Sequence, residues 1–455
     1  MTTSSLTLPV VTIQNTFPEV LQEVQEGIIP HDKFWVSCYK TGETSIHAKV
    51  NAELDDRDRN LVVLKAVDGD VEVTRDIDGN YNVACKSLGI HPTKILTPVQ
   101  EYKDQERANP ARPHRITAFD VSPDSSRFAT GYLDGSIFLY PTSSFQSPPI
   151  DLVPKAIDIT KSRTTSRPHL SGVTSLKFFP SSRVLLSTGL DFSLTVLPAD
   201  LPDAGASAGA RVTPVRTMRA HVRSVTDTAI IALGRNVVSS SLDSTVKLWD
   251  VSSGEVITSL LAKAGVSSMS IGDRPPVPPD GEEHAPPTSK DARELPETAS
   301  KVVFCGLESG SFEVFDLGFK KSVYTSQGGN GSVTSIAYSD AHSLLATGTE
   351  KGNVTMYDTR SFATPLTSFR RLDTSIEDLT FIGTKNGGVG LVVATSDGLP
   401  YVASVVPEGP AVHAELVGAD CDPVKKVTVR LDGNRTDIWS ASDDGIVRRY
   451  AFGAK

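Results

Sequence analysis

The 455-residue sequence has no long apolar run and no excess of basic residues. No stretch approaches the roughly 18 apolar residues needed to cross a bilayer, and the first residues lack the basic and apolar segments of a secretory signal. We therefore expect no membrane partner and a cytoplasmic and nuclear location. Lys and Arg number 45 against 54 Asp and Glu, a net charge of −9, which disfavours nucleic-acid partners and favours basic protein partners.

Motifs for metal binding and catalysis are also missing. The four cysteines, Cys38, Cys85, Cys305 and Cys421, include no Cys-x-x-Cys pair, so the sequence predicts neither a zinc site nor a disulfide framework. Phosphate-binding and dinucleotide-binding glycine motifs, His-Glu-x-x-His and Gly-x-Ser-x-Gly are absent too. These absences favour a noncatalytic protein with no metal and no cofactor.

A repeated pattern covers most of the chain, and its clearest copy runs from Ala220 to Asp250. It consists of His221, an apolar strand, a Ser-rich strand that ends at a turn with Asp243, and an apolar strand that closes on Trp249. This pattern resembles the WD repeat, in which about 40 to 45 residues form one four-stranded blade. We interpret His221, Ser241, Asp243 and Trp249 as a structural hydrogen-bonded network rather than a catalytic triad, because a fully satisfied buried network stabilises a blade.

Acidic turn residues mark seven copies of the pattern, at Asp134, Asp191, Asp243, Glu308, Glu350, Asp397 and Asp444. Residues 93–455 are therefore predicted to form an all-β, seven-bladed WD-repeat β-propeller. The Pro-rich, charged insertion at 272–300 is predicted to be disordered, because it cannot bury enough apolar surface. The last copy has only three strands before the chain ends, so we expect residues 94–102 to supply the fourth.

Residues 1–92 contain no repeat and are predicted to form a small α+β domain. A short helix is expected to begin at Pro18. Strands are expected over 33–39, 45–50, 61–67, 71–75 and 81–85, with a hairpin turn between the last two.

Charge is predicted to be polarised over one face of the propeller. Loops that lead into the first strand of each blade share this face with the turns between second and third strands, whereas the insertions belong to the other face. Blades 1 to 3 contribute basic residues to it: Arg112, Arg115, Lys161, Arg163, Arg167, Arg219 and Arg223. Blades 6 and 7 contribute acidic residues: Asp373, Glu377, Asp378, Asp420 and Asp422. A solvated surface of mixed sign is one interpretation; the other, which we prefer, is a docking face that orients a basic partner.

Three stretches, 226–239, 415–427 and 444–450, resemble the proteasomal ATPase-associated factors, a family of WD-repeat assembly chaperones for the base of the proteasome regulatory particle. The resemblance implies a noncatalytic chaperone, monomeric when free, that binds the C-terminal domain of a proteasomal ATPase subunit through acidic residues. Asp420 and Asp422 lie in a matching loop, and Asp227 lies in the first matching stretch.

Two alternatives remain open from the sequence. Residues 356–360, with Asp358 and Arg360, are similar to the box through which some WD-repeat adaptors contact a cullin-type ubiquitin ligase, which would make the protein a substrate adaptor. An enzymatic propeller is the other alternative, but the strands expected to line its channel offer mostly Val, Ser, Thr and Leu.

Overall fold

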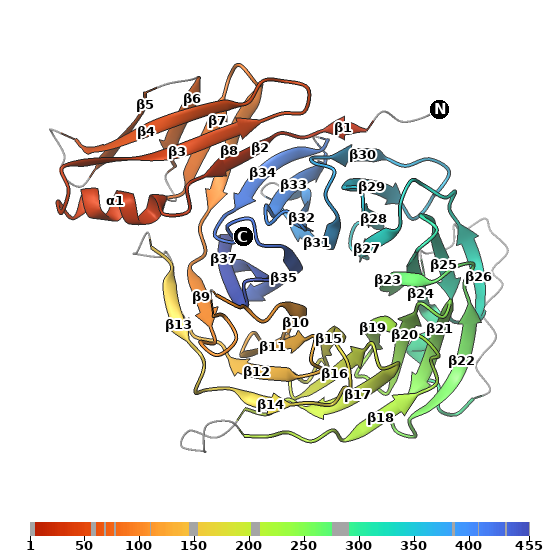
Figure 1. Ribbon diagram of the computed structural model, residues 1–455. Coiled ribbons are helices and arrows are strands. Elements are labelled where there is room, and N and C mark those ends of the chain that lie inside the picture. Colours follow the sequence, from red (N-terminus) through yellow and green to blue (C-terminus); the bar gives the residue numbers. More distant parts are fainter. Residues whose placement is uncertain are drawn as a thin grey trace.

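Seven small antiparallel sheets form a ring around a central channel in the computed structural model (Figure 1). The structure describes residues 5–454 except 56–60, 68–69, 77–78, 110, 145–152, 202–209, 275–290, 385–386, 408 and 433–434. The predicted all-β, seven-bladed propeller is confirmed.

Blades 1 to 6 each contain four strands, ordered from the channel outward, which are consecutive in the chain except in blade 1, where β13 (Lys155–Asp158) leaves for blade 7 between the third and fourth strands. Blade 1 comprises β10 (Ile116–Val121), β11 (Arg127–Tyr132), β12 (Ile137–Pro141) and β14 (Thr164–Ser166). Blade 2 comprises β15 (Val173–Phe178), β16 (Val184–Gly189), β17 (Ser193–Pro198) and β18 (Arg216–Arg219). Blade 3 comprises β19 (Val225–Ile231), β20 (Asn236–Ser241), β21 (Thr245–Asp250) and β22 (Glu255–Leu261). Blades 4 to 6 comprise β23 (Val266–Asp273), β24 (Lys301–Leu307), β25 (Phe312–Asp316) and β26 (Lys321–Thr325); β27 (Val333–Ser339), β28 (Leu344–Thr349), β29 (Asn353–Asp358) and β30 (Thr367–Arg370); and β31 (Ile376–Gly383), β32 (Val389–Thr395), β33 (Tyr401–Val406) and β34 (Ala411–Leu416).

Blade 7 joins the two ends of the propeller. Its inner strands are β35 (Val424–Asp432), β36 (Arg435–Ser442) and β37 (Ile446–Ala454), and β9 (Gln100–Lys103) pairs antiparallel with β37. A further strand, β13 (Lys155–Asp158), pairs with β9 in parallel on the outside. Blade 7 is therefore built from strands of both ends of the propeller, which closes the ring.

The strand that closes the ring is shorter than predicted. Residues 94–96 belong instead to β8 (Ile90–Leu96), which pairs in parallel with β34 of blade 6. The chain then passes Pro98 and reaches blade 7 only at β9. The boundary expected between residues 92 and 93 therefore falls inside a strand.

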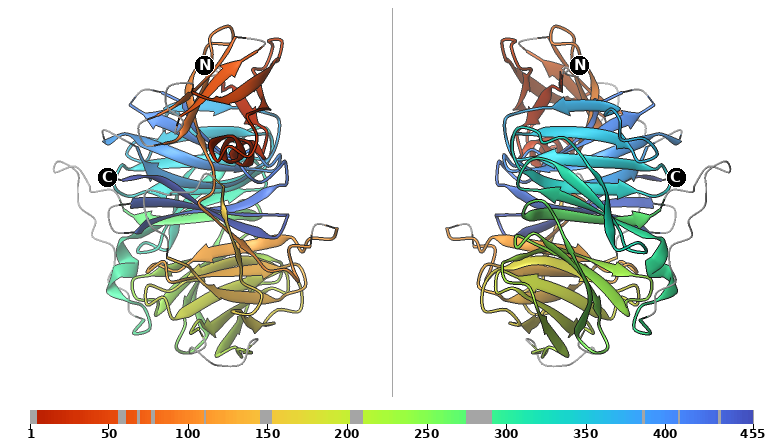
Figure 2. Two further views of the ribbon diagram at one scale, coloured as in Figure 1. Left: turned by 90° about the vertical axis from the view of Figure 1, so that its left-hand side faces the viewer. Right: turned by 90° about the vertical axis from the view of Figure 1, so that its right-hand side faces the viewer.

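The N-terminal region contains one helix and two sheets. β2 (Val10–Ile13), β3 (His31–Tyr39), β4 (Ile46–Leu54) and β5 (Val62–Ala66) form one sheet, and β6 (Val71–Arg75) and β7 (Tyr81–Cys85) extend β8 and blade 6 into another. α1 (Phe17–Gln25) begins with Pro18 in its first turn and buries one apolar face. β1 (Leu6–Thr7) pairs with β30. Figures 1 and 2 show this region beside blades 6 and 7, at the edge of the disc rather than over the channel.

We call the face that carries the lead-in loops and the turns between second and third strands the upper face. Most of these turns pack on the loop that leads into the next blade. A Cβ atom on Gly135 of blade 1, for example, would lie 2.2 Å from the carbonyl oxygen of His169, which precedes blade 2. Loops of neighbouring blades therefore form one continuous upper surface.

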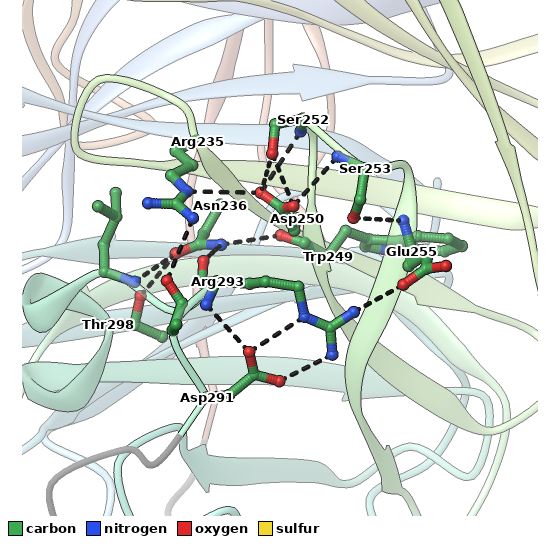
Figure 3. Close-up of polar contacts among 12 residues, drawn as sticks. Arg235, Asn236, Trp249, Asp250, Ser252, Ser253, Glu255, Asp291, Arg293 and Thr298 are labelled. Atoms are coloured by element: carbon green, nitrogen blue, oxygen red, sulfur yellow. Dashed lines mark hydrogen bonds and ion pairs between the residues drawn. The ribbon is translucent and has the colours of Figure 1, made fainter.

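The predicted disordered insertion at 272–300 is corrected at both ends. Residues 272 and 273 belong to β23, and residues 291–300 pack on the lower side of blade 3, ending in a 3-10 helix, η1 (Pro296–Ser300). The Asn236 side chain donates to the carbonyl oxygen of Arg293 (3.0 Å) and accepts from the amide of Leu295 (2.7 Å) (Figure 3). Asn236 thus satisfies two backbone groups of the segment, and Arg293 also contacts Glu255 of β22 at 2.8 Å. Residues 275–290 lie outside the described part of the chain.

Candidate functional site

The loop from β34 to β35, residues 417–423, carries two of the predicted partner-binding residues on the upper face. Asp420 and Cys421 both adopt left-handed backbone conformations, with φ of 48° and 67°. Such a conformation costs a non-glycine residue about 1 to 2 kcal/mol. The loop is held by the neighbouring turn of blade 6, where a Cβ atom on Gly398 would lie 2.4 Å from the Cys421 carbonyl carbon. The backbone of blade 6 therefore imposes the conformation that presents Asp420 and Asp422.

The carboxylates of Asp420 and Asp422 have no hydrogen-bond or ion-pair partner in the described part of the chain, and Asp420 is exposed. Burial and the Asp444 carboxylate raise the pKa of Asp422, against the opposing effect of Arg448. Two nearby carboxylates without a direct ion-pair partner create a negative potential that a basic partner would relieve.

Two other predicted acidic residues are already paired. Asp373 is 81% exposed and contacts Arg370 at 2.9 Å. Glu377 contacts Lys425 at 3.0 Å. Both pairs lie near the upper ends of blades 5 to 7, beside the Asp420 loop.

Asp378 and Asp227 lie in the central channel. For Asp378, this corrects the predicted position in a lead-in loop of the upper face. They line a polar cavity of about 360 Å³ between the innermost strands. Asp378 contacts Lys426 at 3.3 Å, and Asp227 accepts a hydrogen bond from Ser175 at 2.8 Å. Register shifts precede both residues, between 376 and 378 and between 225 and 227, and they direct these side chains toward the channel.

A groove of about 610 Å³ runs between the Asp420 loop and the N-terminal region. Its walls include Trp35 and Tyr39 of β3 on one side, and Val417 and Cys421 on the other. Trp35 is 48% exposed, with the Lys49 ammonium 4.8 Å from its ring centre. Sequence analysis missed this groove, because its two walls are far apart along the chain.

A buried ion pair forms the floor of the groove. Arg371 and Glu415 contact each other directly, and both side chains are almost completely buried. Glu415 also accepts from the Val11 amide at 3.0 Å, and Arg371 donates to the Pro9 carbonyl at 2.9 Å. The guanidinium lies over the Tyr401 ring, 4.3 Å from its centre. The pair thus attaches the N-terminal segment to blade 6, and Glu415 lines the groove.

The structural network of blade 3 differs from the prediction in one residue. His221 contacts Asp243 at 2.8 Å and Ser239 at 2.7 Å, and the Trp249 indole donates to Ser239 at 2.8 Å. The prediction of Ser241 in this role was wrong: its hydroxyl bonds the Arg223 carbonyl at 3.1 Å. Ser239 lies two residues before Ser241 in β20, farther from the turn, at the point where the His221 and Trp249 rings approach each other. Ser241 lies at the turn.

Burial and hydrogen bonding shift the protonation of this network. Burial lowers the pKa of His221, although Asp243 opposes the shift. For Asp243, burial opposes ionisation, but hydrogen bonds from Thr245, the Val222 amide and His221 outweigh it and lower the pKa to about 2. Near pH 7, His221 is therefore neutral and Asp243 is ionised.

Blade 2 contains most of the same network, which the sequence interpretation assigned in full only to blade 3. His169 contacts Ser187 at 2.9 Å and Asp191 at 3.0 Å, and Leu197 takes the position of the tryptophan. The histidine, serine and aspartate spacings were visible in the sequence and could have identified it.

The residues of the adaptor-like box lie at the end of β29, on the lower face. Arg360 forms a bidentate pair with Asp358, at 2.9 and 2.6 Å, and remains 67% exposed. This box is therefore far from the Asp420 loop, across the thickness of the disc. Among the described residues, no group of three or more His, Cys, Asp or Glu side chains could hold a metal ion, and no helix is long and apolar enough to span a membrane.

Comparison with known proteins identifies the repeat. Residues 110–140, 160–196, 212–250 and 320–358 match the family model "WD domain, G-beta repeat", and these stretches fall on blades 1, 2, 3 and 5. The chain therefore contains WD repeats.

Similarity to individual proteins is partial. The chain is 32% identical to proteasomal ATPase-associated factor 1 of Homo sapiens over 107 residues, 24% of each chain, and 35% identical to striatin-3 of Rattus norvegicus over 94 residues, 20% of this chain and 12% of striatin-3. It is 24% identical to pre-mRNA-processing factor 19 of Bos taurus over 254 residues, 54% of this chain and 41% of that protein. The matches thus span less than half the length of each of these relatives.

Proposed function

We propose that this protein is a noncatalytic assembly chaperone of the proteasome regulatory particle base. In this proposal, Asp420 and Asp422 bind basic side chains on the C-terminal domain of a proteasomal ATPase subunit. The unpartnered state of these two carboxylates, on a loop held in a strained conformation, is the observation that carries the proposal. Backbone strain at an exposed polar loop is typical of binding sites.

The groove supplies an apolar contact beside this charge. Trp35 and Tyr39 present aromatic surface that is rigidly supported by β3. Aromatic anchors contribute most of the affinity at protein interfaces, whereas exposed charges mainly orient the partner and speed association. A basic segment with one large apolar side chain would therefore place that side chain in the groove and its cations near Asp420.

Two further considerations support this assignment. A relative with 32% identity over the matched part carries the name proteasomal ATPase-associated factor 1. The resemblance in residues 415–427 includes the loop with Asp420 and Asp422. Occupation of the ATPase C-terminal domain would delay its docking on the proteolytic core until the base is assembled. The proposal includes a cytoplasmic and nuclear location and a monomeric free state.

The experiment measures binding of the full-length protein to purified C-terminal domains of the proteasomal ATPase subunits by biolayer interferometry. We expect one subunit to bind, with affinity that falls as salt is added, because screening weakens exposed charge pairs. Asp420→Asn with Asp422→Asn should weaken binding at least about tenfold, equivalent to about 1.4 kcal/mol. Asparagine keeps the side-chain shape and tolerates the left-handed backbone of residue 420.

A matched control removes two acidic charges elsewhere on the same face. Glu308→Gln with Glu350→Gln changes exposed residues in the turns of blades 4 and 5 and alters the net charge equally. Binding should be retained by this control. Equal loss in both variants would assign the effect to net charge and contradict the role of the loop, and absence of binding to every ATPase domain would refute the proposed partner.

A further inference from the structure

A second part of the upper face, over blades 1 to 3, exposes large apolar side chains. Leu170 is 83% exposed, Val222 74% and Phe192 42%. Together with Leu133 and Leu190, which are also exposed, they form what we call the Phe192 patch. These residues come from lead-in loops and turns of the upper face.

The residues of the patch are adjacent. A Cβ atom on Gly172 would lie 3.3 Å from side-chain carbons of both Leu133 and Leu190, which places these two leucines together at the junction of blades 1 and 2. The Leu170 amide donates to Asp191 at 3.1 Å, directly beside Phe192 in the sequence. Leu133, Leu170, Leu190 and Phe192 therefore lie on loops that meet at the junction of blades 1 and 2, and Val222 lies on the lead-in loop of the next blade.

Phe192 occupies a position that disfavours a bulky residue. It adopts φ of 67°, and the equivalent turn position has positive φ in all seven blades. The other six are Gly135, Ser244, Gly310, Gly352, Gly398 and Gly445. A large side chain in this conformation is a true outlier, and here partial exposure gives it little packing in return. Outliers of this kind persist where they serve binding.

The charge around the patch is positive. Arg167, Arg219 and Arg223 are exposed on the surrounding loops. The carboxylates of the same turns already have partners: Asp134 contacts Arg107 at 3.4 Å, Asp191 accepts from His169 and the Leu170 amide, and Asp243 accepts from His221 and the Val222 amide. The patch therefore combines apolar surface with a basic border, opposite in sign to the Asp420 loop.

We infer that the Phe192 patch is a docking surface for an acidic protein segment that carries large apolar side chains. Charge complementarity with the arginine border selects acidic residues, and Phe192, Leu170 and Val222 supply the apolar contact. This surface is independent of the proposed function, and it would let the protein hold two partners of opposite charge on one face.

The test is a selection of random phage-displayed peptides for binding to the full-length protein. The affinity of the enriched peptides is then measured by fluorescence polarisation. We expect enriched sequences that combine Asp or Glu with Leu, Phe or Trp. Phe192→Gly should weaken their binding at least about tenfold, equivalent to about 1.4 kcal/mol. The same substitution should raise the melting temperature, because glycine relieves the left-handed strain.

If Phe192→Gly weakens peptide binding but raises the melting temperature, Phe192 serves docking rather than stability. Arg219→Glu with Arg223→Glu should also weaken binding, whereas Asp420→Asn with Asp422→Asn should leave it unchanged, so failure of either surface can be recognised separately. Enrichment of basic peptides, enrichment of none, or binding that survives Phe192→Gly would overturn the inference. So would self-association of the protein through the patch, or tighter binding of a single-stranded oligonucleotide than of acidic peptides.

Discussion

Attachment of the N-terminal region to blade 6 depends on the buried pair of Arg371 and Glu415, and Glu415→Leu tests this. The substitution keeps the side-chain volume nearly constant but leaves the guanidinium without its carboxylate and the Val11 amide without its acceptor. Removal of one partner from a buried ion pair typically costs about 3 to 5 kcal/mol. Burial raises the pKa of Glu415 and Arg371 opposes the shift, so the carboxylate depends on its partner as well.

The assay is urea unfolding together with amide hydrogen exchange of residues 6–13. We expect Glu415→Leu to lower the free energy of unfolding by about 3 to 5 kcal/mol. Exchange should accelerate selectively in β1 and β2, which the pair holds against blades 5 and 6. The groove beside Asp420 should open in consequence, since Glu415 lies in its floor.

The double variant Arg371→Met with Glu415→Leu distinguishes an unpaired charge from simple loss of a contact. Replacement of a whole buried pair by apolar residues is often neutral or stabilising, so most of the lost stability should return. A single variant that loses less than about 1 kcal/mol, or a double variant as unstable as the single one, would refute this reasoning.

Three further predictions concern blade 3. Ser239→Ala should lower the free energy of unfolding by about 2 to 4 kcal/mol in urea titrations, because it leaves two buried ring nitrogens, of His221 and Trp249, without a partner. Asn236→Ala should speed tryptic cleavage between residues 291 and 300, since it removes the bonds that hold this segment; unchanged cleavage would contradict that role. Stability should fall as pH drops below about 6.5, because burial lowers the pKa of His221 and the unfolded chain then binds the extra proton, and below about 3.8 the Asp243 contribution is lost as well. In a variant with His221→Gln, the urea midpoint should change less between pH 7 and pH 5 than in the unsubstituted protein.

The repeat architecture could be predicted from local patterns. Alternating apolar residues, turn signals and the spacing of acidic turn residues all lie within single blades, so the ring of seven followed from the sequence. The helix beginning near Pro18 was predictable for the same reason. The candidate loop was visible too, because Asp420 and Asp422 are only two positions apart in the chain.

Contacts between distant residues decided the rest. Ser239 rather than Ser241 bonds His221, because the His221 and Trp249 rings approach each other at Ser239 from different strands. Whether a carboxylate has an ion-pair partner depends on basic residues far away in the sequence, such as Lys426 beside Asp378. The pairing of β8 with β34 and the packing of residues 291–300 on blade 3 likewise depend on residues far away in the sequence. The sequence by itself determined the strands and their repetition, since these follow from side-chain alternation and turn chemistry over a few residues. Only the tertiary structure decided which charges remain unpaired and where apolar groups stay exposed, because burial and neutralisation are properties of surfaces that come together from separate parts of the chain.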